Sequence, residues 1–328
     1  NSGNANACAP DGMENARRMA KAAADFLGVD EEDVAVASTG VIGQRINIEC
    51  IEEHLSEIVL SDDASEQANR AIMTTDTRTK TAAVEFTVGG KTCRIGGICK
   101  GSGMIHPNMG TMLSFITTDC AISHEMLTDA LQENVKKTYN RVTVDGDTST
   151  NDMCVVLANG LAGNELIDWQ NEDYQAFCKA LNEINTRLAR QIAADGEGAT
   201  KLVTCTVKNS RSEETAERLA KAVVGSNLAK AAMFGADANW GRVLCAMGYS
   251  KAPFRPEYVD VAFESENGSV AVCEKGAALN FDEELAKKVL TANEVTIQID
   301  VHEGEHAATA WGCDLTYDYV KINGDYRT

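Results

Sequence analysis

The residues with the clearest capacity for chemistry lie between Lys100 and Phe115. This stretch opens as a glycine-rich loop with one proline, passes through Gly110-Thr111, and continues into an apolar segment of strand-like composition. A threonine at a loop-to-strand junction presents a hydroxyl, which becomes a nucleophile when a base is held against it. Gly110 has no Cβ and leaves room for attack on its carbonyl. On their own, these residues suggest a hydroxyl nucleophile at Thr111 without establishing it.

A second pattern, His302-Glu303-Gly304-Glu305-His306, matches the H-E-x-x-H signature of zinc proteases. The signature needs a helix, because only i,i+4 spacing on a helix brings both imidazoles to one metal ion. This segment instead continues an alternating strand, on which the two histidines would lie roughly 13 Å apart. We therefore predict two surface histidines and no metal site. The run 145–149 hints at a calcium loop, but Val156 stands where that loop requires a glutamate.

The segment from Lys100 to Leu113 closely resembles the self-processing segment of the ornithine acetyltransferase (glutamate N-acetyltransferase) family, commonly written K-G-x-G-M-[I/L]-x-P-x-M-A-T-[M/L]-L. The resemblance covers essentially the whole chain, and agreement in so many collinear blocks is highly specific. The other blocks are Asn1–Cys8, Ser38–Gly43, Met73–Asp76, Asp145–Asp152, Glu197–Lys201, Asn239–Arg242 and Asn323–Thr328. Three departures stand out: Gly110 replaces the usual alanine, Ala238 replaces a common proline, and family chains carry several tens of residues upstream of the first block.

The resemblance implies that the chain cuts its own peptide bond between Gly110 and Thr111. Cleavage would give Thr111 a free α-amine, whose reference pKa of about 7.7–8.0 leaves it partly unprotonated near neutral pH. One residue would then supply both nucleophile and general base. Its hydroxyl is expected to take acetyl from N-acetylornithine, release ornithine, and pass the acetyl group to glutamate. The resemblance implies no cofactor and no metal; acetyl-CoA is a further candidate acetyl donor.

The same resemblance assigns Thr39 and Gly40 to the oxyanion hole of both reactions. A hydroxyl and a backbone N–H are typical oxyanion donors, each worth about 3–4 kcal/mol of transition-state stabilisation. The pair follows an apolar stretch, residues 34–37, that predicts a strand. Lys100 suits a substrate carboxylate, and Glu197 suits the ammonium group of ornithine. The full set of substrate contacts implied by the resemblance is Thr74, Lys100, Thr111, Glu197, Asn323 and Thr328.

Two other activities are compatible with these residues. An amidohydrolase or aminopeptidase with an N-terminal nucleophile would use the same threonine and pass the acyl group to water. A homologue that cannot process itself would only bind amino acids or partner proteins. The active transferase should instead yield segments 1–110 and 111–328, which the resemblance implies assemble as a heterotetramer with two copies of each.

The elements that hold these groups follow two periodicities. Apolar side chains recur at helical spacing in 13–27, 174–192 and 213–224, and they alternate with polar ones in 84–88 and 295–301. Two alternating runs around Asn267-Gly268 predict a β-hairpin. Interleaved helices and strands predict an α/β (α+β) fold of mixed β-sheets layered with helices. We expect a catalytic domain over 1–208 and a smaller C-terminal α/β domain over 209–328, whose tail closes the active site.

Composition limits the partners. The 328 residues carry a net charge of -19, which opposes binding to nucleic acid or an anionic membrane because both need a basic face. The eleven cysteines are scattered without any C-x-x-C pair, which predicts reduced core thiols in a cytoplasmic compartment. For a eukaryotic source the mitochondrial matrix is expected instead. The longest apolar runs are far too short to span a membrane.

Overall fold

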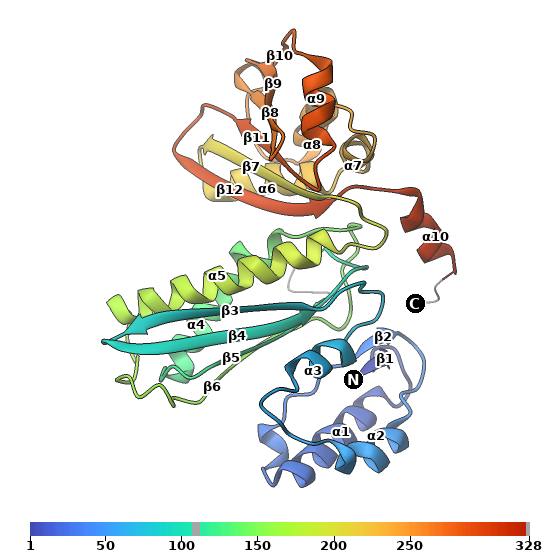
Figure 1. Cartoon of the computed structure of the whole chain (residues 1–328), viewed down its shortest axis with the longest axis vertical. Coiled ribbons are helices and arrows are strands. Elements are labelled where there is room, and N and C mark those ends of the chain that lie inside the picture. The colour runs from blue at the N-terminus through green and yellow to red at the C-terminus, as the bar shows by residue number, and fades with distance from the viewer. Residues whose placement is uncertain (107–111, 326–328) are drawn as a thin grey trace.

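The computed structural model describes residues 1–106 and 112–325. Within these residues the chain forms three successive units, built on sheets of two, four and six strands. The four-stranded unit lies between the other two (Figure 1). The interleaved helices and mixed sheets confirm the predicted α/β (α+β) class.

The N-terminal unit is a short parallel strand pair flanked by helices, with a small core of Met19, Ile46 and Ile48. The strand predicted over residues 34–37 is wrong: the ladder instead pairs Thr39–Val41 with Ser2–Asn4. Apolar composition alone does not make a strand, because backbone groups in a strand need a partner strand to bond. The elements are β1 (Ser2–Asn4), α1 (Gly12–Leu27), η1 (Glu31–Asp33), β2 (Thr39–Val41), α2 (Ile48–His54), η2 (Leu55–Glu57) and α3 (Ser65–Ala71).

The central unit is a four-stranded sheet in the order β3-β4-β5-β6, in which only β5 and β6 are parallel. The long helix α5 packs on β3 and β4 and also contacts α4. Its stripe of Phe177, Leu181, Ile184 and Leu188 is completely buried, as the helical periodicity predicts. The elements are β3 (Lys80–Val88), β4 (Lys91–Lys100), β5 (Leu113–Thr118), α4 (His124–Lys137), η3 (Tyr139–Arg141), β6 (Met153–Ala158) and α5 (Glu172–Ala194).

The C-terminal unit is a six-stranded sheet in the order β10-β9-β8-β11-β7-β12, with helices packed on one face. The predicted hairpin is confirmed as β8–β9, and the predicted helix 213–224 is α6. The last helix, α10, leaves this sheet and extends past the central unit (Figure 1). The elements are β7 (Leu202–Ser210), α6 (Glu213–Val224), α7 (Asn227–Phe234), α8 (Trp240–Tyr249), η4 (Pro256–Tyr258), β8 (Asp260–Ser265), β9 (Gly268–Glu274), β10 (Ala277–Ala278), α9 (Glu283–Leu290), β11 (Glu294–Asp300), β12 (His306–Cys313) and α10 (Tyr317–Asp325).

The change from one sheet to the next comes earlier than the expected domain limit at 208/209. That limit falls inside β7, which pairs with β11 from Leu202 to Lys208 and with β12 on its other side. The six-stranded sheet therefore begins at Leu202. The polar run after β7, which suggested the limit, is the turn into α6, where Ser212 caps the helix by accepting a hydrogen bond from the Thr215 N–H.

The cysteines are free thiols, and eight of the eleven are buried or half-buried, as expected for core residues. Only Cys8, Cys50 and Cys245 are exposed. Among the helices in the described ranges, none combines the length and the apolar composition needed to cross a bilayer.

Leu188→Ala should lower the free energy of unfolding by about 2–5 kcal/mol, because the cavity left under β4 cannot fully close. The Leu188 side chain is completely buried, and one of its methyl carbons lies 3.3 Å from where a Cβ on Gly97 would stand. Leu157→Ala is the matched control, because Leu157 is 62% exposed. Urea unfolding of both variants checks this, and equal losses would contradict the packing described for α5.

Candidate active site

One cavity collects residues that are far apart in the sequence. It has a volume of about 390 Å³ and is bordered by the N-terminal unit, the end of β4, the segment after α5, and α10. Figure 1 shows these elements on the same side of the molecule. Six of the predicted site residues line this cavity: Thr39, Gly40, Thr74, Lys100, Glu197 and Asn323. The others, Gly110, Thr111 and Thr328, lie outside the described residues.

Thr39 and Gly40 reach the cavity on β2. Gly40 has a φ of +118°, and a Cβ at this position would lie 2.0 Å from the carbonyl oxygen of Gly3. Any other residue would therefore push β2 away from β1. The tight pairing of the two strands places the Thr39 hydroxyl 3.4 Å from the ammonium nitrogen of Lys100.

Lys100 is the cation of the cavity. It ends β4, is almost fully buried, and donates a hydrogen bond of 2.8 Å to the Thr74 hydroxyl. Its ammonium nitrogen lies 3.7 Å from Oδ2 of Asp76. Burial lowers the pKa of Lys100, and the nearby carboxylates of Asp76 and Glu197 oppose that shift. This ammonium can bind a carboxylate group of a ligand.

Glu197 is the buried anion among the residues that line the cavity; Asp145 and Asp147 also line it and are more exposed. Its backbone N–H donates to the Ser102 carbonyl at 2.9 Å, and its Oε2 accepts a hydrogen bond of 2.7 Å from the Asn323 amide. The carboxylate packs directly on Gly103, where a Cβ would lie 2.2 Å from the carboxyl carbon. The cavity therefore carries one buried ammonium and one buried carboxylate, which suits a ligand that has both charges.

Residues 143–153, here called the clamp loop, end at the first residue of β6 and hold the chain on the N-terminal side of residue 107. Asp145 accepts hydrogen bonds from the backbone N–H groups of Met104 and Ile105, at 2.7 and 2.9 Å. The His106 carbonyl accepts a bond of 2.8 Å from the Thr148 hydroxyl. Three successive residues are thus hydrogen-bonded to the clamp loop. Met104 and Ile105 donate to a carboxylate, and His106 accepts from a hydroxyl.

The clamp loop also holds the chain on the C-terminal side, at Met112. The Met153 N–H donates to the Met112 carbonyl at 2.9 Å, and the Asp152 carboxylate accepts from the Met112 N–H. Burial raises the pKa of Asp152 to about 7, although this hydrogen bond and the Lys100 ammonium act in the opposite direction. The Asp152 carboxylate therefore changes its charge near neutral pH. Its hydrogen-bond partner, Met112, is the residue that follows position 111.

Sequence reasoning did not assign roles to Asp145 and Asp152. Both lie in a block that matched the family, and the calcium-loop comparison treated Asp145 only as a potential metal ligand. Their hydrogen bonds to backbone N–H groups leave no trace in residue spacing. Tyr319 on α10 also lines the cavity without having been predicted, next to the predicted Asn323.

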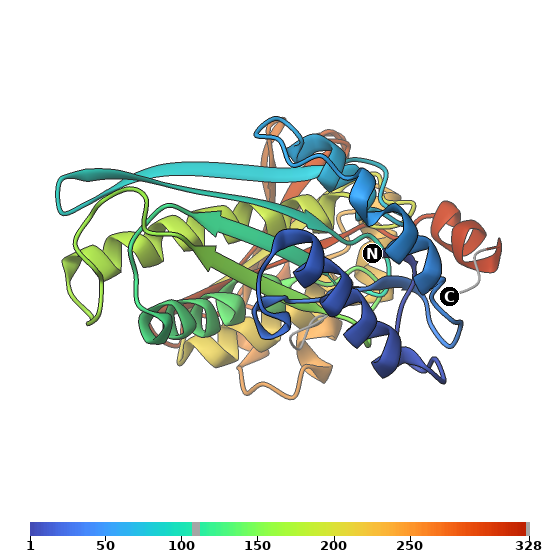
Figure 2. The ribbon, with the colours of Figure 1, turned by 90° about the horizontal axis from the view of Figure 1, so that it is seen from below.

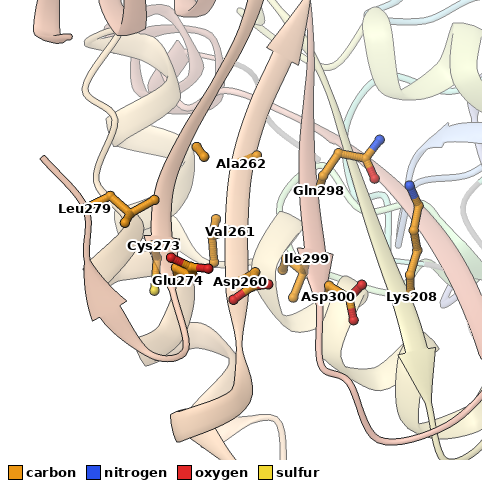
Figure 3. Close-up of a pocket in the computed structure, with 11 residues that line it drawn as sticks. Lys208, Asp260, Val261, Ala262, Cys273, Glu274, Leu279, Gln298, Ile299 and Asp300 are labelled. Atoms are coloured by element: carbon orange, nitrogen blue, oxygen red, sulfur yellow. The ribbon is translucent and has the colours of Figure 1, made fainter. Parts of the chain in front are cut away.

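A second hollow, of about 410 Å³, lies on the six-stranded sheet between β9, β8, β11 and β7 (Figure 3). Lys208, Asp260 and Gln298 line it, and none of the predicted site residues does. The two histidines of the H-E-x-x-H segment are exposed, as predicted, and His302 is bonded to Asp260 at 2.7 Å. In the described part of the chain, no group of three or more His, Cys, Asp or Glu side chains is arranged to hold a metal ion.

The fold and the cavity define an α/β protein whose cavity is lined by a buried ammonium and a buried carboxylate. The ArgJ family profile matches residues 1–328. Arginine biosynthesis bifunctional protein ArgJ 1 of Clostridium acetobutylicum is 53% identical, with 100% of this chain and 81% of that protein covered. The ArgJ protein of Caldanaerobacter subterraneus is 51% identical, with 100% and 82% covered. The chain belongs to the ArgJ family, and it is an acyltransferase.

A solved structure supports the same assignment. The crystal structure of arginine biosynthesis bifunctional protein argJ from Bacillus halodurans is 46% identical to this chain, with a TM-score of 0.62. The match covers 66% of this chain and 100% of the solved one.

Gly103→Ala should weaken the binding of ornithine about tenfold or more, because the new methyl group displaces the Glu197 carboxylate from its charge-assisted contacts. Isothermal titration calorimetry measures this directly. Gly248→Ala on α8 is the matched control, since a Cβ there meets no atom within 4 Å. Unchanged affinity in Gly103→Ala would show that Glu197 does not bind the ligand.

Proposed function

We propose that this chain is a self-processing glutamate N-acetyltransferase that moves acetyl from N-acetylornithine to glutamate. The observation that carries the proposal is the cavity, in which Thr39, Gly40, Lys100 and Glu197 come together. The clamp loop bonds to Met104 and Ile105, of which Met104 lines the cavity, and to Met112 on the other side of position 111. The acyltransferase class of the family agrees with this chemistry.

The two charges of the cavity fit both substrates. Lys100 binds the α-carboxylate that N-acetylornithine and glutamate share, and Glu197 with Asn323 binds the side-chain ammonium of ornithine. Fixing both ends of N-acetylornithine places its acetyl group between them, at the reacting centre. Glutamate lacks the ammonium at its far end, so the same site takes the two amino acids in turn.

Self-cleavage begins with attack of the Thr111 hydroxyl on the Gly110 carbonyl. The C–N bond breaks, the threonine nitrogen takes up the proton and becomes a free amine, and Gly110 is left as an ester of the threonine oxygen. Water then hydrolyses this ester, which gives the carboxylate of Gly110 and the free hydroxyl of Thr111. The hydroxyl of Thr39 and the N–H of Gly40 stabilise the oxyanion formed at the carbonyl.

Acetyl transfer reuses the same groups in two steps. The Thr111 amine takes the hydroxyl proton and the oxygen attacks the acetyl carbon. The amide C–N bond breaks, and the Thr111 ammonium returns the proton to the leaving α-nitrogen of ornithine. The α-amine of glutamate then attacks the acetyl-threonine ester, and N-acetylglutamate leaves as the hydroxyl is restored. Because the freed amine is the base, the cut precedes the transfer.

The length of the solved relative supports the cut. Its whole chain matches 66% of this one, about 216 residues, which is close to the length of segment 111–328. We further propose that the two segments remain associated, as two copies of each, in the cytoplasm. The word "bifunctional" in the relatives' names makes acetyl-CoA a candidate second donor for the same threonine.

Asp145→Ala should slow self-cleavage about tenfold or more, because the N–H groups of Met104 and Ile105 lose their acceptor and the scissile segment loses its alignment. A time course on a denaturing gel measures the rate. Asp147→Ala, two residues along the same loop, is the control, since Asp147 is exposed. Equal rates in the two variants would argue against alignment by the clamp loop.

Thr111→Ala should abolish both the cut and the transfer, because it removes the oxygen that both reactions use. The parent protein should give a fragment that begins Thr-Met-Leu-Ser-Phe and should form N-acetylglutamate from N-acetylornithine and glutamate. Thr92→Ala, at an exposed position on β4, is the matched control.

Two results would contradict the proposal. Transfer activity retained by Thr111→Ala would remove the threonine from the mechanism. Release of acetate without N-acetylglutamate by the parent protein would identify a hydrolase instead.

A further inference from the structure

Four charged side chains form a buried cluster, of which Lys100 lines the cavity. The Lys80 ammonium lies 2.6 Å from Oδ1 of Asp76 and 2.5 Å from Oδ2 of Asp195, and all three side chains are at most 3% exposed. Lys100 completes the cluster through its 3.7 Å contact with Asp76. Two positive and two negative charges are thus removed from water together. Such a cluster is tolerated only when its hydrogen bonds are nearly complete.

Asp76 is occupied by partners other than Lys100. Its Oδ1 accepts hydrogen bonds from Lys80 and, at 2.7 Å, from the Gly101 N–H. Its Oδ2 accepts a longer bond of 3.2 Å from the Thr74 N–H. Lys100 is left with a loose ionic contact to Asp76, and its short hydrogen bond goes to the uncharged hydroxyl of Thr74. The Lys100 ammonium therefore has a countercharge nearby but no tight ion pair.

Asp195 connects the same cluster to the anionic end of the cavity. It follows the last residue of α5 and lies two residues before Glu197. Its backbone carbonyl accepts a bond of 2.6 Å from the Ser102 hydroxyl, and the Ser102 carbonyl in turn accepts from the Glu197 N–H. Lys80 thus links Asp76, which contacts Lys100, to Asp195 in the segment that carries Glu197.

We propose that Lys80 and Asp195 are positioning residues for substrate binding, which keep Asp76 occupied so that the Lys100 ammonium stays available to the substrate carboxylate. Neither touches the substrate. This inference rests on the proposed function, because it assumes that Lys100 binds the carboxylate of both amino acids.

The decisive variant combines Lys80→Met with Asp195→Asn, which removes one charge of each sign from the cluster. Without Lys80, the Oδ1 of Asp76 keeps the Gly101 N–H but loses its charged partner. The Asp76 carboxylate then draws Lys100 into a close ion pair, which each substrate carboxylate must displace. We expect KM for both N-acetylornithine and glutamate to rise about tenfold or more, with kcat changed less than about threefold. Self-cleavage on a gel shows whether the variant is folded.

A matched control combines Arg211→Met with Glu303→Gln, a charge-balanced removal of another ion pair with a buried carboxylate. It lies in the C-terminal unit and should leave both KM values unchanged. A purely structural role for Lys80 and Asp195 would lower the melting temperature of the decisive variant with KM within about twofold of the parent. That result would overturn the proposal.

A pH profile gives a second, independent readout through Asp76→Asn. The charged groups around the Lys100 ammonium are Asp76, Glu197 and Asp152, whose carboxylates favour its protonated form, and Lys80, which disfavours it. Removing the Asp76 charge lowers the pKa of Lys100 further, so kcat/KM should fall at a lower alkaline pH than in the parent. A uniform loss of activity with an unshifted alkaline limb would also overturn the proposal.

A different experimental result would show that the proposed function itself is wrong. If Lys100→Met leaves KM for both substrates unchanged, Lys100 does not bind the carboxylate and the assumption itself is wrong. If Lys100→Met raises KM while the Lys80 and Asp195 variant does not, the function stands and only the positioning role is lost.

Discussion

The site depends on keeping opposite charges buried without letting them neutralise each other. An ammonium and a carboxylate removed from water attract strongly, and they would close on each other if the fold allowed it. Lys100 and Glu197 are kept apart because each has its own neutral partner, the Thr74 hydroxyl and the Asn323 amide. Both charges therefore remain available to a ligand that carries the complementary pair.

Holding those groups apart requires elements from all three units. Lys100 is placed by the end of β4, which is bonded on both sides within the four-stranded sheet. Glu197 lies just after α5, which packs on that same sheet, and Asn323 comes from a helix that follows the six-stranded sheet. Glycine allows the closest approaches, at Gly40 beside Gly3 and at Gly103 beside Glu197. A rigid sheet and these backbone contacts together set the width of the cavity.

Periodicity predicted the elements whose burial depends on local pattern, such as α5, α6 and the β8–β9 hairpin. It failed where the partner is distant in sequence: residues 34–37 look like a strand, but β1 pairs with 39–41. The start of the six-stranded sheet at Leu202 was likewise not visible in the sequence, since β7 pairs in parallel with β11, more than eighty residues later. The joint burial of Asp76, Lys80 and Asp195 could not be predicted either, because each charge by itself looks like a solvated surface group.

The sheet order explains how a cut between residues 110 and 111 can leave the site intact. β4 would be the last strand of the first segment, and β5 would be the first strand of the second. The two strands are nevertheless paired, from Ile95 opposite Thr118 to Lys100 opposite Leu113. The first segment would contribute Thr39, Gly40 and Lys100, and the second would contribute Glu197 and Asn323. The clamp loop bonds to residues 104–106 and to residue 112, so it would still hold the described chain on both sides of the cut. Breaking one peptide bond would then change the chemistry available at position 111 without releasing either half of the fold.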